Sequence, residues 1–274
     1  MIVGMWHSTI KVFNVICNEH MTELFDAVKN NDTVATRRLL RTGWNANLVE
    51  KCQYDGMETS LLSTACDFGG DSNAMVQLLL EHNADVNLRD LTATVALHIA
   101  AISGKDDAVR LMIQVGADVH AKCILGNTPL IMCTRPRFVN NSDCRRRIAE
   151  NLIVMGADIN AVNNDDECCL HYAAQGGDIE MVDFLIKKGA KTEIKDNCGR
   201  TAEMRAHMNR HTAVAGLISR RIFERVRRRK IRISKFLVFV MGNFGRFKEN
   251  SYVGLLPLCV LPIVLEKLRI LDDD

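Results

Sequence analysis

A Leu-centred pattern returns six times along this chain at a period of about 33 residues, and this repetition restricts the fold more than any other feature. The reference position is occupied by Leu24, Leu61, Leu97, Leu130, Leu170 and, in a degenerate sixth copy, Glu203. Successive spacings are 37, 36, 33, 40 and 33 residues, which is one period with insertions of four, three, none, seven and none. A repeat of this length predicts a solenoid, in which each unit buries its apolar face only against its neighbours.

Each copy of the pattern predicts two helices followed by a turn. Thr128 and Pro129 favour a helix start, because the threonine hydroxyl can accept a backbone N–H and proline needs no donor at the first helical position. Apolar residues at helical spacing, as in Val109, Met112 and Ile113, predict the second helix. The second helix then ends at a residue that tolerates a left-handed backbone: Gly43, Asn83, Gly116, Gly156 and Gly189.

Three segments follow related patterns: Val-Ala-Leu-His-Ile-Ala-Ala at 95–101, Thr-Pro-Leu at 128–130 and Cys-Cys-Leu-His-Tyr-Ala-Ala at 168–174. They resemble the signature of the ankyrin repeat family, and the resemblance covers roughly residues 21–225. It implies an all-α ankyrin-repeat solenoid, built from stacked helix-turn-helix repeats with extended turn fingers.

We expect the chain to have three parts. An N-terminal extension (1–20) precedes the repeats, and a segment that is first basic and then apolar (226–274) follows them and ends in a short helix. The repeats are expected at 21–54, 55–90, 91–123, 124–163 and 164–197, with a degenerate repeat at 198–225.

The family resemblance also implies where a partner binds, because ankyrin fingers and the inner faces of the first helices form a concave groove. The residues expected to contact a protein partner are Tyr54, Met57, Arg89, Asp90, Leu125, Asn127, Arg135, Phe138, Asn164, Asp165 and Lys195. Two insertions, at 48–57 and 134–144, are favoured as specificity elements, because loops added to a rigid scaffold commonly carry recognition. The alternative for each residue is a solvated turn without a role.

Nothing in the sequence indicates catalysis, a cofactor or a metal site. The ten cysteines contain no Cys-x-x-Cys pair, and we expect them to be free and to pack as small apolar residues. There is no Gly-rich phosphate loop and no nucleophile elbow, so we expect no enzyme. The resemblance implies that His98 and His171 tie helix starts to neighbouring backbone.

The sequence gives no sign of a membrane span or a signal peptide. The longest apolar stretch, 254–265, has about 12 residues, whereas a bilayer-spanning helix needs about 20. Residues 1–17 have only short apolar runs, which favours a reducing compartment, and we expect a cytoplasmic monomer.

Charge is divided unevenly along the chain. Residues 1–200 hold 20 Lys and Arg against 26 Asp and Glu, whereas residues 201–274 hold 15 against 7. The basic excess gathers at Arg220–Arg232. It is open to three interpretations: a solvated helix face, a nuclear-import signal at Arg225–Lys230, or a contact with nucleic acid or an anionic membrane. Nucleic acid is not favoured, because no aromatic residues are interleaved with the charges and no nucleic-acid-binding fold is evident.

The apolar C-terminal segment resembles that of ankyrin and SOCS-box proteins, which are substrate receptors of cullin–RING ubiquitin ligases. An F-box-like start and a hydrophobic cap on the last repeat are the alternatives. The resemblance implies elongin, cullin or Skp1 components as partners of a C-terminal contact set: Leu237, Leu258, Leu261, Pro262 and Leu265.

The function expected from these features is non-catalytic protein binding, as a scaffold that brings a captured substrate to a ubiquitin ligase. The alternative is an inhibitor that masks a signalling or transcription factor, in which the acidic repeat surface meets a basic partner.

Overall fold

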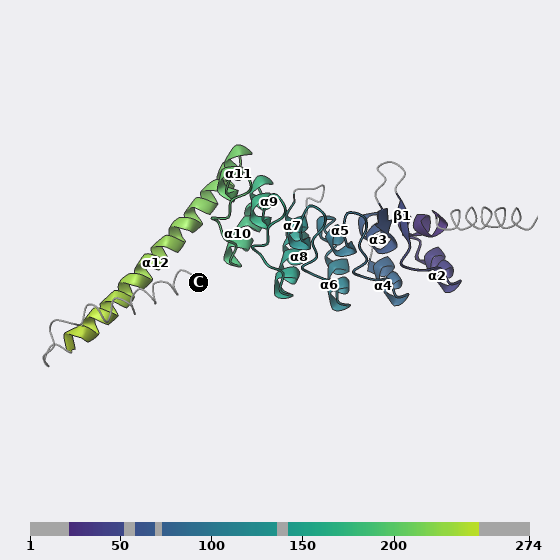
Figure 1. Cartoon of the computed structure of the whole chain (residues 1–274), viewed down its shortest axis with the longest axis horizontal. Coiled ribbons are helices and arrows are strands. Elements are labelled where there is room, and N and C mark those ends of the chain that lie inside the picture. The colour runs from purple at the N-terminus through teal and green to yellow at the C-terminus, as the bar shows by residue number, and fades with distance from the viewer. Residues whose placement is uncertain (1–21, 52–57, 69–72, 136–141, 247–274) are drawn as a thin grey trace, which may run out of the picture. The chain divides into compact units, whose positions relative to one another are not determined.

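The computed structural model describes residues 22–51, 58–68, 73–135 and 142–246. The chain divides into two units, residues 1–215 and 216–274. The described part of the first unit is a stack of short helices, which confirms the predicted solenoid (Figure 1). One feature is added to the all-α prediction: a small antiparallel sheet of two strands.

The elements follow one another in pairs along the chain. Residues 22–29 form the first helix. The helices after it are α2 (Thr33–Arg41), α3 (Leu61–Phe68), α4 (Asn73–Glu81), α5 (Ala96–Ile102), α6 (Asp106–Gln114), α7 (Pro129–Thr134), α8 (Ser142–Val154), α9 (Cys169–Gln175), α10 (Ile179–Lys187), α11 (Ala202–Met208) and α12 (Thr212–Arg246). The strands are β1 (Val49–Lys51) and β2 (Glu58–Ser60), with Val49 opposite Ser60.

The helices of the first unit lie in two layers. One layer is the row α3, α5, α7, α9 and α11, in which each helix packs against the next, and the other is the row α2, α4, α6, α8 and α10 (Figure 1). Fully buried leucines at the reference positions, such as Leu61, Leu97 and Leu130, lie in the first row. Small residues three positions on, including Ala100 and Cys133, are also fully buried, which lets neighbouring helices approach closely.

Local signals set the helix ends as the sequence predicts. The hydroxyl of Thr128 accepts the backbone N–H of Ile131 at 3.3 Å, and Pro129 occupies the first position of α7. At the other end of a repeat, Gly116 follows α6 with a φ of 94° and Asn83 follows α4 with a φ of 62°. Glycine adopts this left-handed conformation freely and asparagine tolerates it better than most residues do.

The two strands of the sheet lie at the two ends of the insertion at 48–57, with β1 at its start and β2 directly after it. Residues 49–51 and 58–60 pair antiparallel, and the Lys29 ammonium contacts the Glu50 carboxylate at 2.7 Å. This ion pair joins the sheet to the helix at 22–29. The insertion is therefore flanked by two paired strands, which the all-α prediction did not include.

One continuous helix, α12, runs past the expected end of the sixth repeat. We expect that repeat to extend to residue 225, and the boundary between the two compact units falls at 215/216, within α12. No proline interrupts residues 212–246, so nothing in the sequence forces the helix to stop at 225. None of the helices in the described part of the chain combines the length and the apolar content of a bilayer-spanning helix.

Candidate protein-binding surface

Four turns between successive repeats have the same closed geometry and form the fingers. In each finger the backbone N–H of the first residue donates to the carbonyl of the fifth, at distances of 2.9 to 3.1 Å. The fingers are residues 90–94, 123–127, 163–167 and 196–200. A side-chain oxygen of the first residue also accepts backbone N–H groups in three of them, from Asp90, Asn163 and Asp196.

Backbone hydrogen bonds also join each finger to the next. The N–H of Ile124 donates to the carbonyl of Thr92 at 2.7 Å, and the N–H of Asn164 donates to the carbonyl of Leu125 at 3.1 Å. The N–H of Asn197 completes the row with a bond of 3.0 Å to the Asp165 carbonyl. The four fingers therefore form a continuous surface whose shape is set before any partner arrives.

Large apolar side chains are exposed on two neighbouring fingers. Leu91 is 64% exposed, Ile124 63% and Leu125 56%. Covering exposed apolar side chains with a partner removes them from water and stabilises the complex. These three residues are therefore candidate contact residues. The next finger is different in character, since Asp165 and Asp166 are exposed there.

Several residues that the sequence nominated lie on this exposed surface. Leu125, Asn164, Asp165 and Lys195 are exposed at the fingers. Arg89 is also exposed, and its guanidinium donates to the Lys122 carbonyl at 3.2 Å.

Three other nominated residues have structural contacts. Asn127 is only 1% exposed, because its amide oxygen accepts from the Asn163 amide at 3.0 Å, so its nomination as a partner contact is corrected. Asp90 is half-buried and holds its own finger together. Arg135 is half-buried, with its guanidinium 5.1 Å from the centre of the Tyr172 ring.

The remaining nominated residues have no described side chain. Tyr54, Met57 and Phe138 lie outside the described residues, and so do Leu258, Leu261, Pro262 and Leu265 of the C-terminal set. Leu237 belongs to α12, but its side chain is not among those described.

His98 and His171, the two histidines of the ankyrin pattern, are fully buried and hydrogen-bond to the backbone, as the family resemblance implies. Nδ1 of His98 accepts the Val95 N–H at 3.3 Å, while its Nε2 lies 3.0 Å from the Asn127 carbonyl. His171 repeats the arrangement, with contacts of 3.1 Å to the Cys168 N–H and the Arg200 carbonyl. Burial lowers the pKa of both imidazoles, which suits neutral structural groups.

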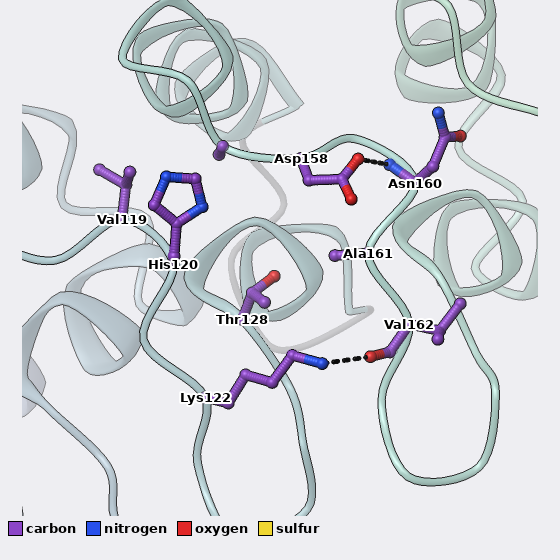
Figure 2. A pocket seen from close by; sticks show the side chains of 9 residues that line it. Val119, His120, Lys122, Thr128, Asp158, Asn160, Ala161 and Val162 are labelled. Carbon is purple, nitrogen blue, oxygen red and sulfur yellow. Dashed lines mark hydrogen bonds between the residues drawn. The ribbon is translucent and has the colours of Figure 1, made fainter.

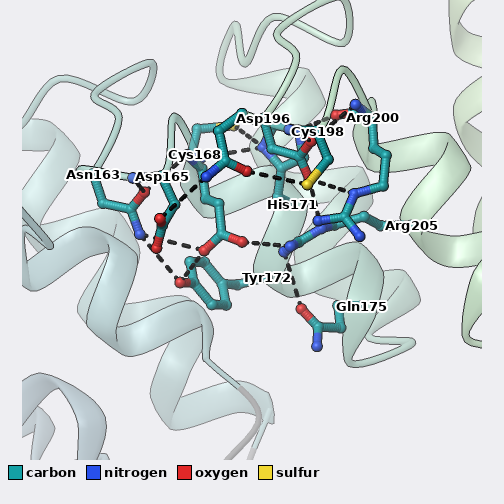
Figure 3. Close-up of polar contacts among 12 residues, drawn as sticks. Asn163, Asp165, Cys168, His171, Tyr172, Gln175, Asp196, Cys198, Arg200 and Arg205 are labelled. Carbon is teal, nitrogen blue, oxygen red and sulfur yellow. Dashed lines mark hydrogen bonds and ion pairs between the residues drawn. The ribbon is translucent and has the colours of Figure 1, made fainter. Parts of the chain in front are cut away.

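A buried polar cluster joins the fifth repeat to the last one (Figure 3). The Arg205 guanidinium pairs with the Glu167 carboxylate and, at 3.1 Å, with the Asp196 carboxylate. It also donates to the Gln175 amide oxygen at 3.1 Å, and the Tyr172 hydroxyl donates to Glu167. All three charged groups are thus paired, which offsets the cost of their burial.

The charge states in this cluster follow from these contacts. Burial alone acts to raise the pKa of Glu167, but hydrogen bonding by Tyr172 and the charge of Arg205 hold that pKa below its usual range. Burial and the neighbouring Glu167 raise the pKa of Tyr172 to about 12. Both shifts favour an ionised Glu167 and a neutral Tyr172, which suits the ion pair of Glu167 with Arg205.

A ladder of asparagine side chains joins the segments that lead into the fingers. Asn47 accepts the Asp85 N–H at 2.6 Å, Asn87 accepts the Asp118 N–H at 2.8 Å, and Asn160 accepts the Lys191 N–H at 2.8 Å. The corresponding residue in the third repeat is His120. Among the described residues drawn in Figure 2, no hydrogen bond joins the His120 imidazole to Asp158.

A pocket of about 370 Å³ lies at this interruption of the ladder (Figure 2). His120 lines one side and Asp158 and Ala161 the other, while the Lys122 ammonium donates to the Val162 carbonyl at 3.1 Å along the rim. The residues that line the pocket come from two adjacent repeats.

The described residues place no metal-binding group together, since no three His, Cys, Asp or Glu side chains converge among them. Cys66, Cys133, Cys168 and Cys169 are free and buried, as expected of small apolar residues. Burial raises the pKa of the Cys66 and Cys133 thiols to about 12, so neither is a reactive thiolate near neutral pH.

Sequence reasoning missed two features of this surface. The cluster around Arg205 joins residues up to 38 positions apart, and no local pattern signals that they meet. The interrupted ladder does have a signal: His120 stands where Asn87 and Asn160 stand in other repeats.

The comparison with known families agrees with this architecture. The family described as Ankyrin repeats (3 copies) matches residues 62–145 and 139–225, which together are more than half of the chain.

Parts of several larger proteins are similar to this chain. A Transient receptor potential cation channel subfamily A member 1 homolog from Caenorhabditis elegans is 32% identical over 158 residues, which are 58% of this chain and 12% of that protein. Neurogenic locus notch homolog protein 1 from Danio rerio is 32% identical over 120 residues, 43% of this chain and 5% of that protein. A mouse B-cell lymphoma 3 protein homolog is 29% identical over 137 residues, 49% of this chain and 29% of that protein. The chain thus matches less than a third of each of these relatives.

Proposed function

Because this chain belongs to the ankyrin repeat family, whose repeats form protein–protein interaction modules, we propose that it binds a partner protein through its row of fingers. The observation that supports this most is the exposure of Leu91, Ile124 and Leu125 on two fingers that a backbone bond holds together. A surface that is already ordered loses little conformational entropy on binding.

The charges beside the apolar residues suggest the chemistry of the partner. Asp165 and Asp166 are exposed on the next finger, where the Asp165 carboxylate accepts from the Asn197 amide at 3.2 Å. A partner with an apolar anchor beside a basic group would match both features.

Substitution of the exposed apolar residues tests this proposal. We expect the double variant Leu91→Glu, Ile124→Glu to lose a defined set of proteins in quantitative affinity purification. The matched control is Val34→Glu, Val154→Glu, because these valines are 79% and 72% exposed and lie in α2 and α8, away from the fingers. The proposal fails if both double variants, folded by circular dichroism, retain the same proteins as the unaltered chain.

At a finer level, we propose that the captured protein is presented to a cullin–RING ubiquitin ligase through residues 226–274. The C-terminal resemblance to SOCS-box and F-box-like segments supports this role, through Leu237, Leu258, Leu261, Pro262 and Leu265. Deleting residues 233–274 is then expected to remove elongin, cullin or Skp1 components while the captured protein is retained. If these components are absent even with the full chain, the adaptor role is excluded.

The alternative is an inhibitor that masks a signalling or transcription factor. The acidic balance of residues 1–200 and the exposed Asp165 and Asp166 favour this role, because they complement a basic partner. It predicts that the chain without residues 233–274 keeps its full inhibitory activity and that binding weakens as salt is raised. Binding that does not change with salt would contradict it.

A further inference from the structure

The part of α12 in the second unit carries the densest charge of the chain. Residues 218–235 contain nine Lys and Arg and a single acid, Glu224. Arg220, Arg227, Arg228 and Arg232 are all exposed. The Glu224 carboxylate accepts from the Arg221 guanidinium at 3.2 Å. This single acid balances one of the nine positive charges.

The helix separates these charges from a set of apolar residues. At about 100° per residue, Ile222, Phe223, Val226 and Ile233 fall within an arc of about 100°. The exposed arginines named above, together with Lys235, lie on the remaining side of the helix. Lys230 falls inside the apolar arc, where its methylene stem can lie along apolar surface while its ammonium reaches water.

The apolar arc is accessible in the structure. Val226 is 46% exposed, Phe223 is exposed, and Ile222 and Ile233 are half-buried. Further along the same helix the sequence continues with six apolar residues, 236–241. A helix with one strongly basic side and one apolar side is typical of segments that lie in the interface of a membrane.

We propose that residues 220–235 of α12 bind an anionic lipid surface, with the apolar arc at the level of the headgroups and the arginines among the phosphates. Each basic residue near such a surface is attracted to it, and the apolar side chains leave water at the same time. A nucleic acid would engage the same charges, but its phosphate backbone gives the apolar arc nothing to bury against. This inference is independent of the finger surface.

Vesicle co-sedimentation of the full chain tests the proposal. We expect binding to phosphatidylcholine vesicles that contain about 30 mol % phosphatidylserine, little binding to pure phosphatidylcholine, and weaker binding as NaCl is raised above about 100 mM. The variant Arg228→Glu, Arg232→Glu is expected to bind on the order of 30-fold more weakly, from about 1 kcal/mol for each basic residue. The control Arg37→Glu, Arg41→Glu makes the same change of charge in α2 and should bind normally.

A second pair of variants separates lipid from nucleic acid. Val226 and Ile231 are both 46% exposed in the same helix, but only Val226 lies in the apolar arc. We expect Val226→Ser to weaken vesicle binding about fivefold and Ile231→Ser to leave it unchanged. Equal effects of the two would overturn the proposal, as would a full chain that binds single-stranded RNA but not the anionic vesicles. Failure to bind the vesicles at low salt would also overturn it, since the arc would then be covered by another part of the chain or by a second copy.

Discussion

His98 is a single residue whose protonation should affect the whole fold. It is fully buried, and its two ring nitrogens contact the Val95 N–H and the carbonyls of Ala121 and Asn127. One imidazole therefore joins the start of α5 to the following finger. Because burial lowers its pKa below the usual 6.5, the folded chain binds this proton less readily than the unfolded chain does.

This difference predicts a pH dependence of stability. The contribution of neutral His98 is complete above the unfolded pKa and is lost as the pH falls from about 6.5 towards the folded pKa, by up to about 1.4 kcal/mol per pH unit. Urea unfolding at several pH values, from about one unit above the usual histidine pKa to about 1.5 units below it, should show this decline in the free energy of unfolding. In His98→Gln, which is less stable overall, the slope should be smaller. An unchanged slope would show that another group is responsible.

At the scale of elements, neighbouring repeats are joined by polar side chains as well as by apolar contacts. The asparagine ladder is the clearest case, because Asn87 bridges to Asp118 and Gly116 of the next repeat, whereas His120 makes no such bridge to Asp158. Among the described residues, the junction between the third and fourth repeats therefore lacks a hydrogen bond that the junctions on either side of it have.

Restoring the missing bridge should stabilise the protein. In His120→Asn, the new amide is expected to accept the Asp158 N–H and to raise the free energy of unfolding by about 0.5–1.5 kcal/mol. Asn87→His should lower it by a similar amount, and thermal unfolding of both variants measures the difference. If His120→Asn is destabilising, the pocket at this junction depends on the imidazole.

The cluster around Arg205 is the corresponding feature at the last junction. In Arg205→Met the shorter, uncharged side chain leaves the buried Glu167 carboxylate without its cationic partner, while Asp196 keeps only Arg200, and we expect the free energy of unfolding to fall by about 3–5 kcal/mol. Hydrogen exchange should rise first in α11. Lys195→Met, which removes the same charge from an exposed site, should change stability little. Similar effects of both variants would argue against the cluster as the cause.

The sequence predicted the elements that depend on local chemistry. Thr128 and Pro129 start a helix and Gly116 follows one, because capping and backbone preference act within a few residues. It did not predict the contact of Arg205 with Glu167, since that pairing depends on how two repeats stack. The burial of Asn127 was missed for the same reason: its amide oxygen meets Asn163 of the following finger. The sequence analysis did not predict α12 as one continuous helix, although no proline or glycine interrupts residues 217–241.

At the scale of the whole molecule, each repeat contacts only its neighbours, so the position of a defect decides how far its effect spreads. Leu97 and Leu24 are both fully buried, but Leu97 lies in a central repeat and Leu24 in the first one. Substitution by alanine should cost about 2–5 kcal/mol at either site. Hydrogen exchange is expected to rise on both sides of the Leu97→Ala site, and only in the first repeats of Leu24→Ala. Identical exchange patterns would mean that the stack unfolds as one unit.

The hydrogen bonds that connect the fingers also fix the distances between contact sites on the surface. Since the backbone of each finger is tied to the next one, as Ile124 is to Thr92 and Asn164 to Leu125, the apolar and acidic sites cannot change their separation independently. A partner must therefore carry its own contact groups at the interval of the repeats. Adding or removing residues between those groups in the partner would abolish recognition even where every contacting side chain is kept.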